Sequence, residues 1–286
     1  MARKKALNQG IASMGSDPEF FIRRTDTGAP TPICGLLGGT KGDPMMLGDY
    51  GAQEDNVMAE YNTPPTDNPG TFARHVQLGR QAILDRLNTM YPGVYEADLS
   101  PARLFPSDAL LHPQAQMFGC SPDFDGYNMG QANPRFTPAD LTRDNGSAWR
   151  FCGGHVHIGY KHLLAYALPE YVVATFADVF LSLPYLLDDK QGERRRYYGT
   201  PGRFRPTAYG IEYRALSNRW TYNIGVAENI GYSVISLGRF LGTGEAAVKR
   251  VWAEIPWVDV RRAITEENFE LGQSVLNYCR QLGVEV

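Results

Sequence analysis

The chain has 286 residues, a net charge of −3 and ordinary shares of apolar and charged residues. This length allows one large domain or two small ones, and the weak net charge gives no broad basic field for nucleic acid or an anionic membrane. The four cysteines form no C-x-x-C pair, which predicts free thiols in a reducing cytoplasm. No apolar run is long enough to span a bilayer. The segment Met1–Met14 lacks the apolar core of a signal peptide, so we expect a loose tail over 1–14 and a single domain over 15–286.

The first third of the chain predicts short strands and one long helix. A strand is expected over Phe20–Arg24, with Glu19 at its entrance. The glycine-rich stretch 35–56 predicts a loop or an irregular hairpin, and its Lys41 lies in Gly-Gly-Thr-Lys-Gly without the spacing of a P-loop. Residues 57–63 alternate as a strand, and a helix follows from about residue 68 to 91.

The remainder predicts irregular loops, two further strands and several helices. Residues 94–148 are turn-rich, and such long ordered loops are often functional. Strands are expected around His155 and over 209–215, separated by a helix over 169–188 that Pro184 should kink and by an Arg-rich segment up to 205. The C-terminal part predicts helices over 223–240, 245–255 and 258–283.

Three predicted strands each carry two polar residues at positions i and i+2, and Glu19 enters a fourth. Side chains two apart on a strand share one face, so several such pairs suggest one concave polar face of a sheet. Each residue also has a purely structural interpretation, as a strand end, a solvated face, a hydrogen-bonded histidine or an exposed basic surface. The pairs are Glu60 and Asn62, His155 and His157, and Glu212 and Arg214.

The chemistry of these side chains fits a divalent cation. Carboxylates favour Mg²⁺ or Mn²⁺, and an added imidazole favours Mn²⁺ or Zn²⁺. Cations held by few carboxylates usually bind substrate phosphates as well, and nearby guanidinium groups would neutralise phosphoryl charge. Arg214 and the segment 194–205 could supply them.

Four motifs, taken together and in this order, resemble those of the phage-type carboxylate–amine ligases (amidoligases), a group within the glutamine synthetase and glutamate–cysteine ligase superfamily. The resemblance runs from about Gly15 to Asn229. The motifs are Ser16-Asp17-Pro18-Glu19-Phe20, Glu60-Tyr61-Asn62-x-Pro64, Gly153-Gly154-His155-Val156-His157-Ile158-Gly159 and Gly210-Ile211-Glu212-Tyr213-Arg214.

The resemblance implies an α+β fold with a curved antiparallel sheet and flanking helices, like the glutamine synthetase catalytic domain. It implies an enzyme that uses ATP and Mg²⁺ or Mn²⁺ to activate a carboxylate as an acyl phosphate, which an amine then attacks. The metal ligands it implies are Glu19, Glu60, His155 and Glu212. It also implies phosphate or nucleotide contacts for Arg214, Arg203, Arg205 and His157, and a substrate contact for Asn62. The sequence itself adds Lys41 and, from the Arg-rich segment, Arg196 as further candidates for binding the nucleotide.

The sequence departs from larger relatives in ways that leave alternatives open. Glu19 stands alone where those relatives often carry paired glutamates, so Glu54 or Asp55 could supply the missing carboxylate. A metal-dependent hydrolase, or a non-catalytic binding or virion-associated protein that keeps the fold, are the competing hypotheses. The expected partners are a small-molecule or peptide carboxylate and an amine, in the cytoplasm (of the host, if the chain is phage-encoded), with a homo-oligomer possible and with neither nucleic acid nor membrane.

Overall fold

A computed structural model describes residues 10–117 and 122–286. Its main sheet is antiparallel and has the strand order β3-β4-β5-β1-β11-β13-β12-β8-β9, with β2 and β6 added to β1, while β7 and β10 form a second, two-stranded sheet. The strands are Ser13–Arg24 (β1), Pro30–Thr31 (β2), Met45–Leu47 (β3), Tyr50–Asp55 (β4), Met58–Asn62 (β5), Tyr95–Asp98 (β6), Ala102–Phe105 (β7), Phe124–Asp125 (β8), Gln131–Ala132 (β9), Ala148–Phe151 (β10), Gly154–Gly159 (β11), Arg203–Pro206 (β12) and Gly210–Tyr213 (β13).

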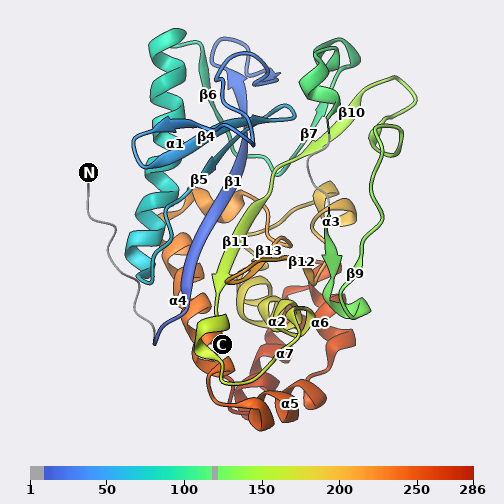
Figure 1. Cartoon of the computed structure of the whole chain (residues 1–286). Helices are drawn as coiled ribbons and strands as arrows, with labels where there is room; N and C mark the ends of the chain where they lie inside the picture. The colour runs from blue at the N-terminus through green and yellow to red at the C-terminus, as the bar shows by residue number, and fades with distance from the viewer. Residues whose placement is uncertain (1–9, 118–121) are drawn as a thin grey trace.

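Most of the helices pack on the apolar side of this sheet. In Figure 1, α1 and α4 lie side by side along β1, while α2, α5, α6 and α7 gather below β12 and β13. The expected α+β class and antiparallel sheet are therefore confirmed. The α-helices are Pro69–Met90 (α1), Glu170–Ala177 (α2), Glu193–Tyr197 (α3), Ile224–Leu241 (α4), Glu245–Glu254 (α5), Trp257–Thr265 (α6) and Phe269–Gln281 (α7). In the described part of the chain, no helix is both long and apolar enough to cross a membrane.

Strand alternation explains why the sheet has one apolar and one polar face. Val156 and Ile158 of β11 are fully buried in the largest apolar cluster, together with residues of α2 and α4. Tyr213 of β13 enters the same cluster. Since neighbouring side chains on a strand point to opposite faces, the histidines of β11 and the charged residues around Tyr213 must face away from this core.

Strand β1 is longer than the sequence predicted. It begins at Ser13, and Ala12 and Met14 are buried, so the end of the expected 1–14 tail belongs to the fold; residues 1–9 lie outside the described part. The prediction placed the strand after Pro18 because the aromatic and β-branched residues begin there. The structure tolerates Pro18 because β1 changes partner there: it pairs with β11 up to Pro18 and with β5 from Glu19.

Two other segments differ from simple expectations. The helix expected over 169–188 is α-helical only to Ala177, continues as a π-helix over Asp178–Ser182 and ends in a 3₁₀ turn at Leu183–Tyr185, as expected for the kink at Pro184. The described part of the irregular region 94–148 contains the short strands β6, β7, β8 and β9 among its loops, and β10 begins at its end. Residues 118–121 of this turn-rich region lie outside the described residues.

Candidate active site

The polar face of the sheet gathers charged side chains from six strands. Asp17 is paired directly with His155, Glu19 with Glu60, and His157 with Glu212. Directly opposed residues in an antiparallel sheet share a face, and so do residues two apart on one strand. The side chains brought to this face are Asp17, Glu19, Gln53, Asp55, Glu60, His155, His157, Arg203, Arg205, Glu212 and Arg214.

Three carboxylates form the first metal-type group, by which we mean a cluster of side chains that could together hold a metal ion. Glu19, Asp55 and Glu60 each offer an oxygen, and these oxygens lie within 4.8 Å of one another. The Gly153 N–H donates to Glu19 Oε2 at 2.6 Å, and Gln53 Nε2 donates to Glu60 Oε2 at 2.6 Å. Burial and the nearby Asp55 raise the pKa of Glu19 to about 8. Burial and the surrounding carboxylates raise the pKa of Glu60 well above its usual value. Such a group needs protons or a cation to offset its repulsion.

A second group lies on the other side of β1. Asp17, His157 and Glu212 also offer ligand atoms within 4.8 Å of one another. His155 lies between them, with Nδ1 3.3 Å from Asp17 Oδ1 and 3.4 Å from Glu212 Oε1. Burial would raise the pKa of Asp17, but His157 and His155 hold it well below its usual value. Burial lowers the pKa of His155 to about 4, with Arg214 acting in the same direction.

Glycines make room for this arrangement. A Cβ on Gly153 would lie 2.2 Å from the imidazole of His155, so the ring occupies space that only glycine leaves. A Cβ on Gly154 would lie 2.2 Å from the Ser217 carbonyl oxygen. The Gly-Gly pair before the first histidine therefore serves close packing around His155.

Arginines border the second group. Arg205 Nη1 lies 2.9 Å from Glu212 Oε2, and Arg214 Nη1 contacts Glu212 Oε1. Arg203 Nη1 pairs with Asp123 Oδ2 at 2.8 Å and its Nε donates to Thr200. These guanidinium groups place positive charge beside carboxylates that could hold a cation.

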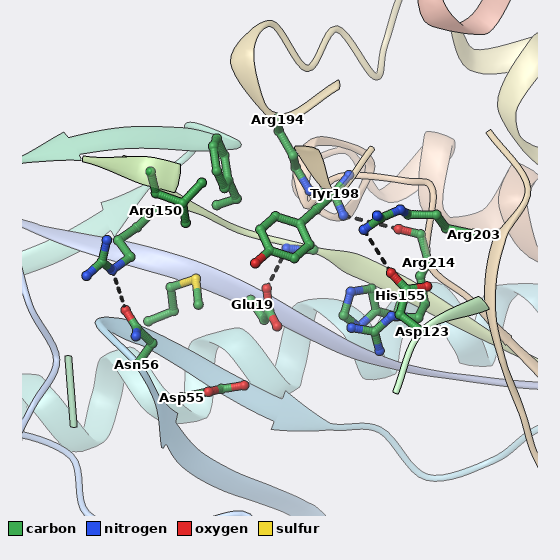
Figure 2. A pocket seen from close by; sticks show the side chains of 14 residues that line it. Glu19, Asp55, Asn56, Asp123, Arg150, His155, Arg194, Tyr198, Arg203 and Arg214 are labelled. Atoms are coloured by element: carbon green, nitrogen blue, oxygen red, sulfur yellow. Dashed lines mark hydrogen bonds and ion pairs between the residues drawn. The ribbon is translucent and has the colours of Figure 1, made fainter. Parts of the chain in front are cut away.

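A pocket opens above Glu19 and Asp55 of the first group, and the space in and over it, open solvent included, is about 540 Å³. Figure 2 shows Glu19 in its middle, with Arg150 and Asn56 at one end and Arg203 and Asp123 at the other. Met58, Leu141 and Phe151 add apolar surface to its lining. The pocket thus combines carboxylates, arginines and a modest apolar wall, as small-molecule sites do.

Arg194 lines this pocket and is buried, with 1% of its surface exposed. Its guanidinium donates to three neutral oxygens: Gln191 Oε1, Ala215 O and Arg214 O. Its Nε is buried without a hydrogen-bond partner. Burial lowers its pKa to about 10, so it still carries a positive charge at neutral pH and adds to the potential of the pocket.

Comparison with known proteins gives one family. The sequence model described as "Phage phiEco32-like COOH.NH2 ligase-type 2" matches residues 136–250. The resemblance to a phage-type carboxylate–amine ligase is confirmed. The match contains the His-x-His strand, the Arg-rich segment and the Glu-x-Arg strand, whereas Glu19 and Glu60 lie before it. No curated protein matches the chain.

For this ligase-like chain, the structure places most of the predicted residues on one face of the sheet, but it divides the predicted metal ligands into two groups. Glu19 and Glu60 belong to one group, and Glu212 to the other. His157, which the sequence placed on the nucleotide side, joins the second group, and His155 lies beside it. The single metal set of the prediction thus becomes two adjacent sets, because β1 runs between them.

The structure also separates the two candidates for the missing carboxylate. Asp55 shares the face of Glu60 and completes the first group. Glu54 points the other way, and its carboxylate accepts hydrogen bonds from the backbone N–H groups of Gly35, Leu37 and Gly38, which holds the preceding loop.

The remaining candidates lie at the margin. Lys41 is exposed, near enough to Asp55 to lower that carboxyl's pKa against the larger effect of burial, and Asn62 is exposed at the end of β5. Arg196 does not line the pocket: its side chain is 75% exposed and pairs with Glu193. Because α3 is helical, Arg194 faces inward and Arg196 outward.

Sequence reasoning did not single out Asp17, Arg194 or Asp123, although Arg194 begins the Arg-rich segment that it named. A signal for Asp17 existed, since it lies two residues before Glu19 and would share its face if the strand ran through Pro18. Asp123 had none, because its pairing with Arg203 joins segments 80 residues apart in the chain.

Proposed function

We propose that this chain is an ATP-dependent carboxylate–amine ligase that activates its carboxylate substrate as an acyl phosphate. The observation that carries the proposal is the pair of metal-type groups on one sheet face, bordered by Arg205 and Arg214. The family match supports the ligase chemistry. We also propose that the sheet is curved and has the fold of the glutamine synthetase catalytic domain.

The residues fit the cation that this reaction requires. Three clustered carboxylates, all with raised pKa values, are compensated best by Mg²⁺ or Mn²⁺. Bound there, the cation would neutralise charge on phosphate oxygens. The residues that would hold it are Glu19, Asp55 and Glu60 in the first group, and Asp17, His157 and Glu212, with His155 beside them, in the second.

The other residues bind and orient the reactants. Arg205 and Arg214 would contact the transferring phosphoryl group, and Arg203 and Lys41 would add positive charge around the nucleotide. A carboxylate oxygen attacks the γ-phosphorus and ADP leaves. The amine nitrogen then attacks the acyl carbon, phosphate leaves, and the nitrogen loses a proton. The pocket must exclude water during this sequence, since water would hydrolyse the acyl phosphate.

An isotope experiment tests the mechanism. The full-length protein is incubated with ATP, Mg²⁺ or Mn²⁺, an amine pool and carboxylates labelled with ¹⁸O. We expect ADP formation that depends on both substrates, and transfer of one ¹⁸O from the carboxylate to the released phosphate. Hydroxylamine used as the amine should give a hydroxamate.

The matched variants are Glu212→Gln, in the site, and Glu96→Gln, at an exposed ion pair with Arg23. The first should abolish ADP formation and the second should leave it unchanged. Metal-dependent hydrolysis without ATP would favour the hydrolase hypothesis. Absence of both ATP binding and turnover across the pools would favour a non-catalytic protein.

A further inference from the structure

Tyr209 lies in the tight turn that joins β12 to β13. The Thr207 N–H donates to the Gly210 carbonyl at 3.0 Å, and the Gly210 N–H donates to Thr207 Oγ1 at 3.0 Å. These two bonds close the turn over four residues. Tyr209 lies at the tip of this turn and is 43% exposed, so its ring is not a component of the apolar core.

The turn is also fixed to the end of β11, the strand of the two histidines. The backbone N–H groups of Tyr160 and Lys161 both donate to the Tyr209 carbonyl, each at 3.1 Å. The Lys161 ammonium donates to the Thr207 carbonyl at 2.9 Å. The backbone position of Tyr209 is therefore set relative to β11 by three hydrogen bonds.

From this fixed position the Tyr209 side chain reaches back to His157. Its hydroxyl is hydrogen-bonded to His157 Nδ1, and the two ring centroids are 6.0 Å apart. The other ring nitrogen, Nε2, lies 3.3 Å from Asp17 Oδ1, and His157 is paired across the sheet with Glu212. The imidazole is thus hydrogen-bonded to Tyr209 through Nδ1, while its other side lies near the carboxylates of Asp17 and Glu212.

We infer that Tyr209 is a positioning residue that aims Nε2 of His157 at a divalent cation held with Asp17 and Glu212. The inference rests on the metal dependence of the proposed function. A ligating nitrogen carries no proton, so the ring proton of His157 lies on Nδ1 and donates to the Tyr209 hydroxyl oxygen. Partners of this kind fix both the tautomer and the ring orientation of a histidine ligand.

The test measures Mn²⁺ binding to the nucleotide-free, full-length protein by the electron paramagnetic resonance signal of free Mn²⁺. Tyr209→Phe keeps the ring and removes the hydroxyl. We expect Tyr209→Phe to lower the Mn²⁺ affinity of one site, the site that Glu212→Gln abolishes, by about 10- to 100-fold. This is the usual effect of losing the hydrogen-bond partner of a histidine ligand. The site that Glu60→Gln abolishes should keep its affinity. Tyr166→Phe is the matched control, since its hydroxyl donates to the distant Leu241 carbonyl, and it should change neither site.

A double-mutant comparison separates positioning from a general structural effect. In a His157→Ala background, adding Tyr209→Phe should have no further effect on Mn²⁺ affinity, because the hydroxyl then has no ring to orient. Equal affinities of wild type and Tyr209→Phe would overturn the inference, as would an equal loss in the two backgrounds. Absence of Mn²⁺ binding by the wild type would refute the metal dependence and this inference with it. Mn²⁺ binding sensitive to Tyr209→Phe, but without ligase activity, would count against the proposed function alone.

Discussion

Asp17 and Glu19 lie two residues apart on β1, yet their pKa values are shifted in opposite directions. Both are buried, which disfavours a charged carboxylate. At Asp17 the imidazoles of His157 and His155 outweigh this effect and hold the pKa well below its usual value. At Glu19 the neighbouring Asp55 adds to it, and the pKa reaches about 8. One strand therefore presents a carboxylate that stays ionised and another that binds a proton when no cation is near.

The raised pKa of Glu19 predicts how stability depends on pH. Its ordinary value is 4.5, so between about 4.5 and 8 the folded state keeps a proton that the unfolded state has lost. The stabilising contribution of this proton is complete below pH 4.5 and is lost as the pH rises through about 8. A cation replaces the proton, so stabilisation by Mn²⁺ should be larger at pH 8 than at pH 6. Thermal unfolding with and without Mn²⁺ at both pH values measures this, and an equal or larger shift at pH 6 would contradict it.

Glu60→Gln should separate stability from cation binding. The amide keeps the shape of the side chain and cannot ionise, so folding no longer has to charge or protonate a buried carboxyl there, and the metal-free protein should become more stable, by on the order of 1 kcal/mol at pH 8. The affinity of this site for Mn²⁺ should fall at least tenfold. Denaturant unfolding and Mn²⁺ titration provide the two readouts, with Glu96→Gln as the exposed control. A loss of stability in the metal-free variant would mean that Glu60 is mainly structural.

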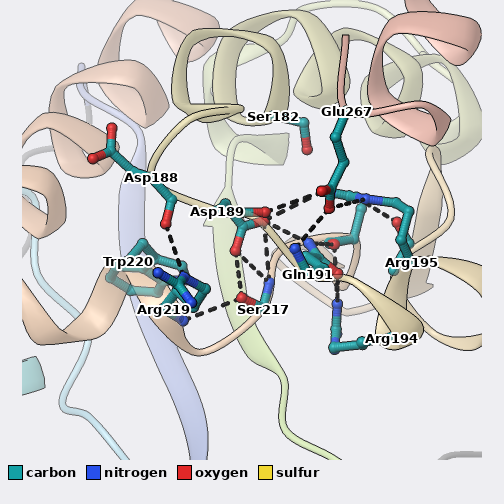
Figure 3. Close-up of polar contacts among 12 residues, drawn as sticks. Ser182, Asp188, Asp189, Gln191, Arg194, Arg195, Ser217, Arg219, Trp220 and Glu267 are labelled. Atoms are coloured by element: carbon teal, nitrogen blue, oxygen red, sulfur yellow. Dashed lines mark hydrogen bonds and ion pairs between the residues drawn. The ribbon is translucent and has the colours of Figure 1, made fainter. Parts of the chain in front are cut away.

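At the scale of elements, a buried polar network fixes the N-terminal end of α3 to the rest of the fold. Figure 3 shows Asp189 at its centre, accepting hydrogen bonds from the Ser217 N–H and hydroxyl and from Gln191. Arg195 lies 3.7 Å from both Asp189 and Glu267. The same network holds Arg194 through Gln191 at 2.6 Å, and so it sets the pocket wall that α3 provides.

Asp189→Asn is the sharpest test of this network, because the neighbouring Asp188 is exposed and offers a matched control. The substitution removes the charge opposite Arg195 and leaves an amide where an acceptor is needed. We expect a loss of stability of about 2–4 kcal/mol, as for breaking a buried charge pair, and little change for Asp188→Asn. Urea unfolding of both variants measures it. Similar stabilities of the two variants would show that the network contributes little.

For the whole molecule, binding of a cation to the folded state alone should raise the unfolding temperature. At a concentration 100 times the dissociation constant, one site contributes about 2.7 kcal/mol. We expect Mn²⁺ to raise the midpoint and a chelator to reverse the change. A Glu60→Gln, Glu212→Gln double variant should show neither effect. A shift retained in that variant would place the stabilising cation elsewhere.

Local periodicity accounts for the parts of the fold and site that the sequence predicted. The period of two identified the strands of His155 and Glu212 and put each polar pair on one face. The register between strands is a long-range property, so the sequence could not show that β1 divides the carboxylates into two groups. Arg194 was named only as part of the Arg-rich segment 194–205, for which the sequence predicted no helix. Without the helix α3, nothing separated the inward Arg194 from the outward Arg196.

The pocket joins two walls with separate origins. Its charged floor comes from Glu19 on β1 and His155 on β11, at the centre of the main sheet, whereas Arg150 and Phe151 come from the two-stranded sheet of β7 and β10. If the chain has the proposed function, exchanging β10 and its flanking loop between related chains should therefore alter which substrate is bound while the residues on the main sheet keep their places. Under that proposal substrate choice would change independently of the chemistry, and β10 is the segment on which a selection for new substrates should act.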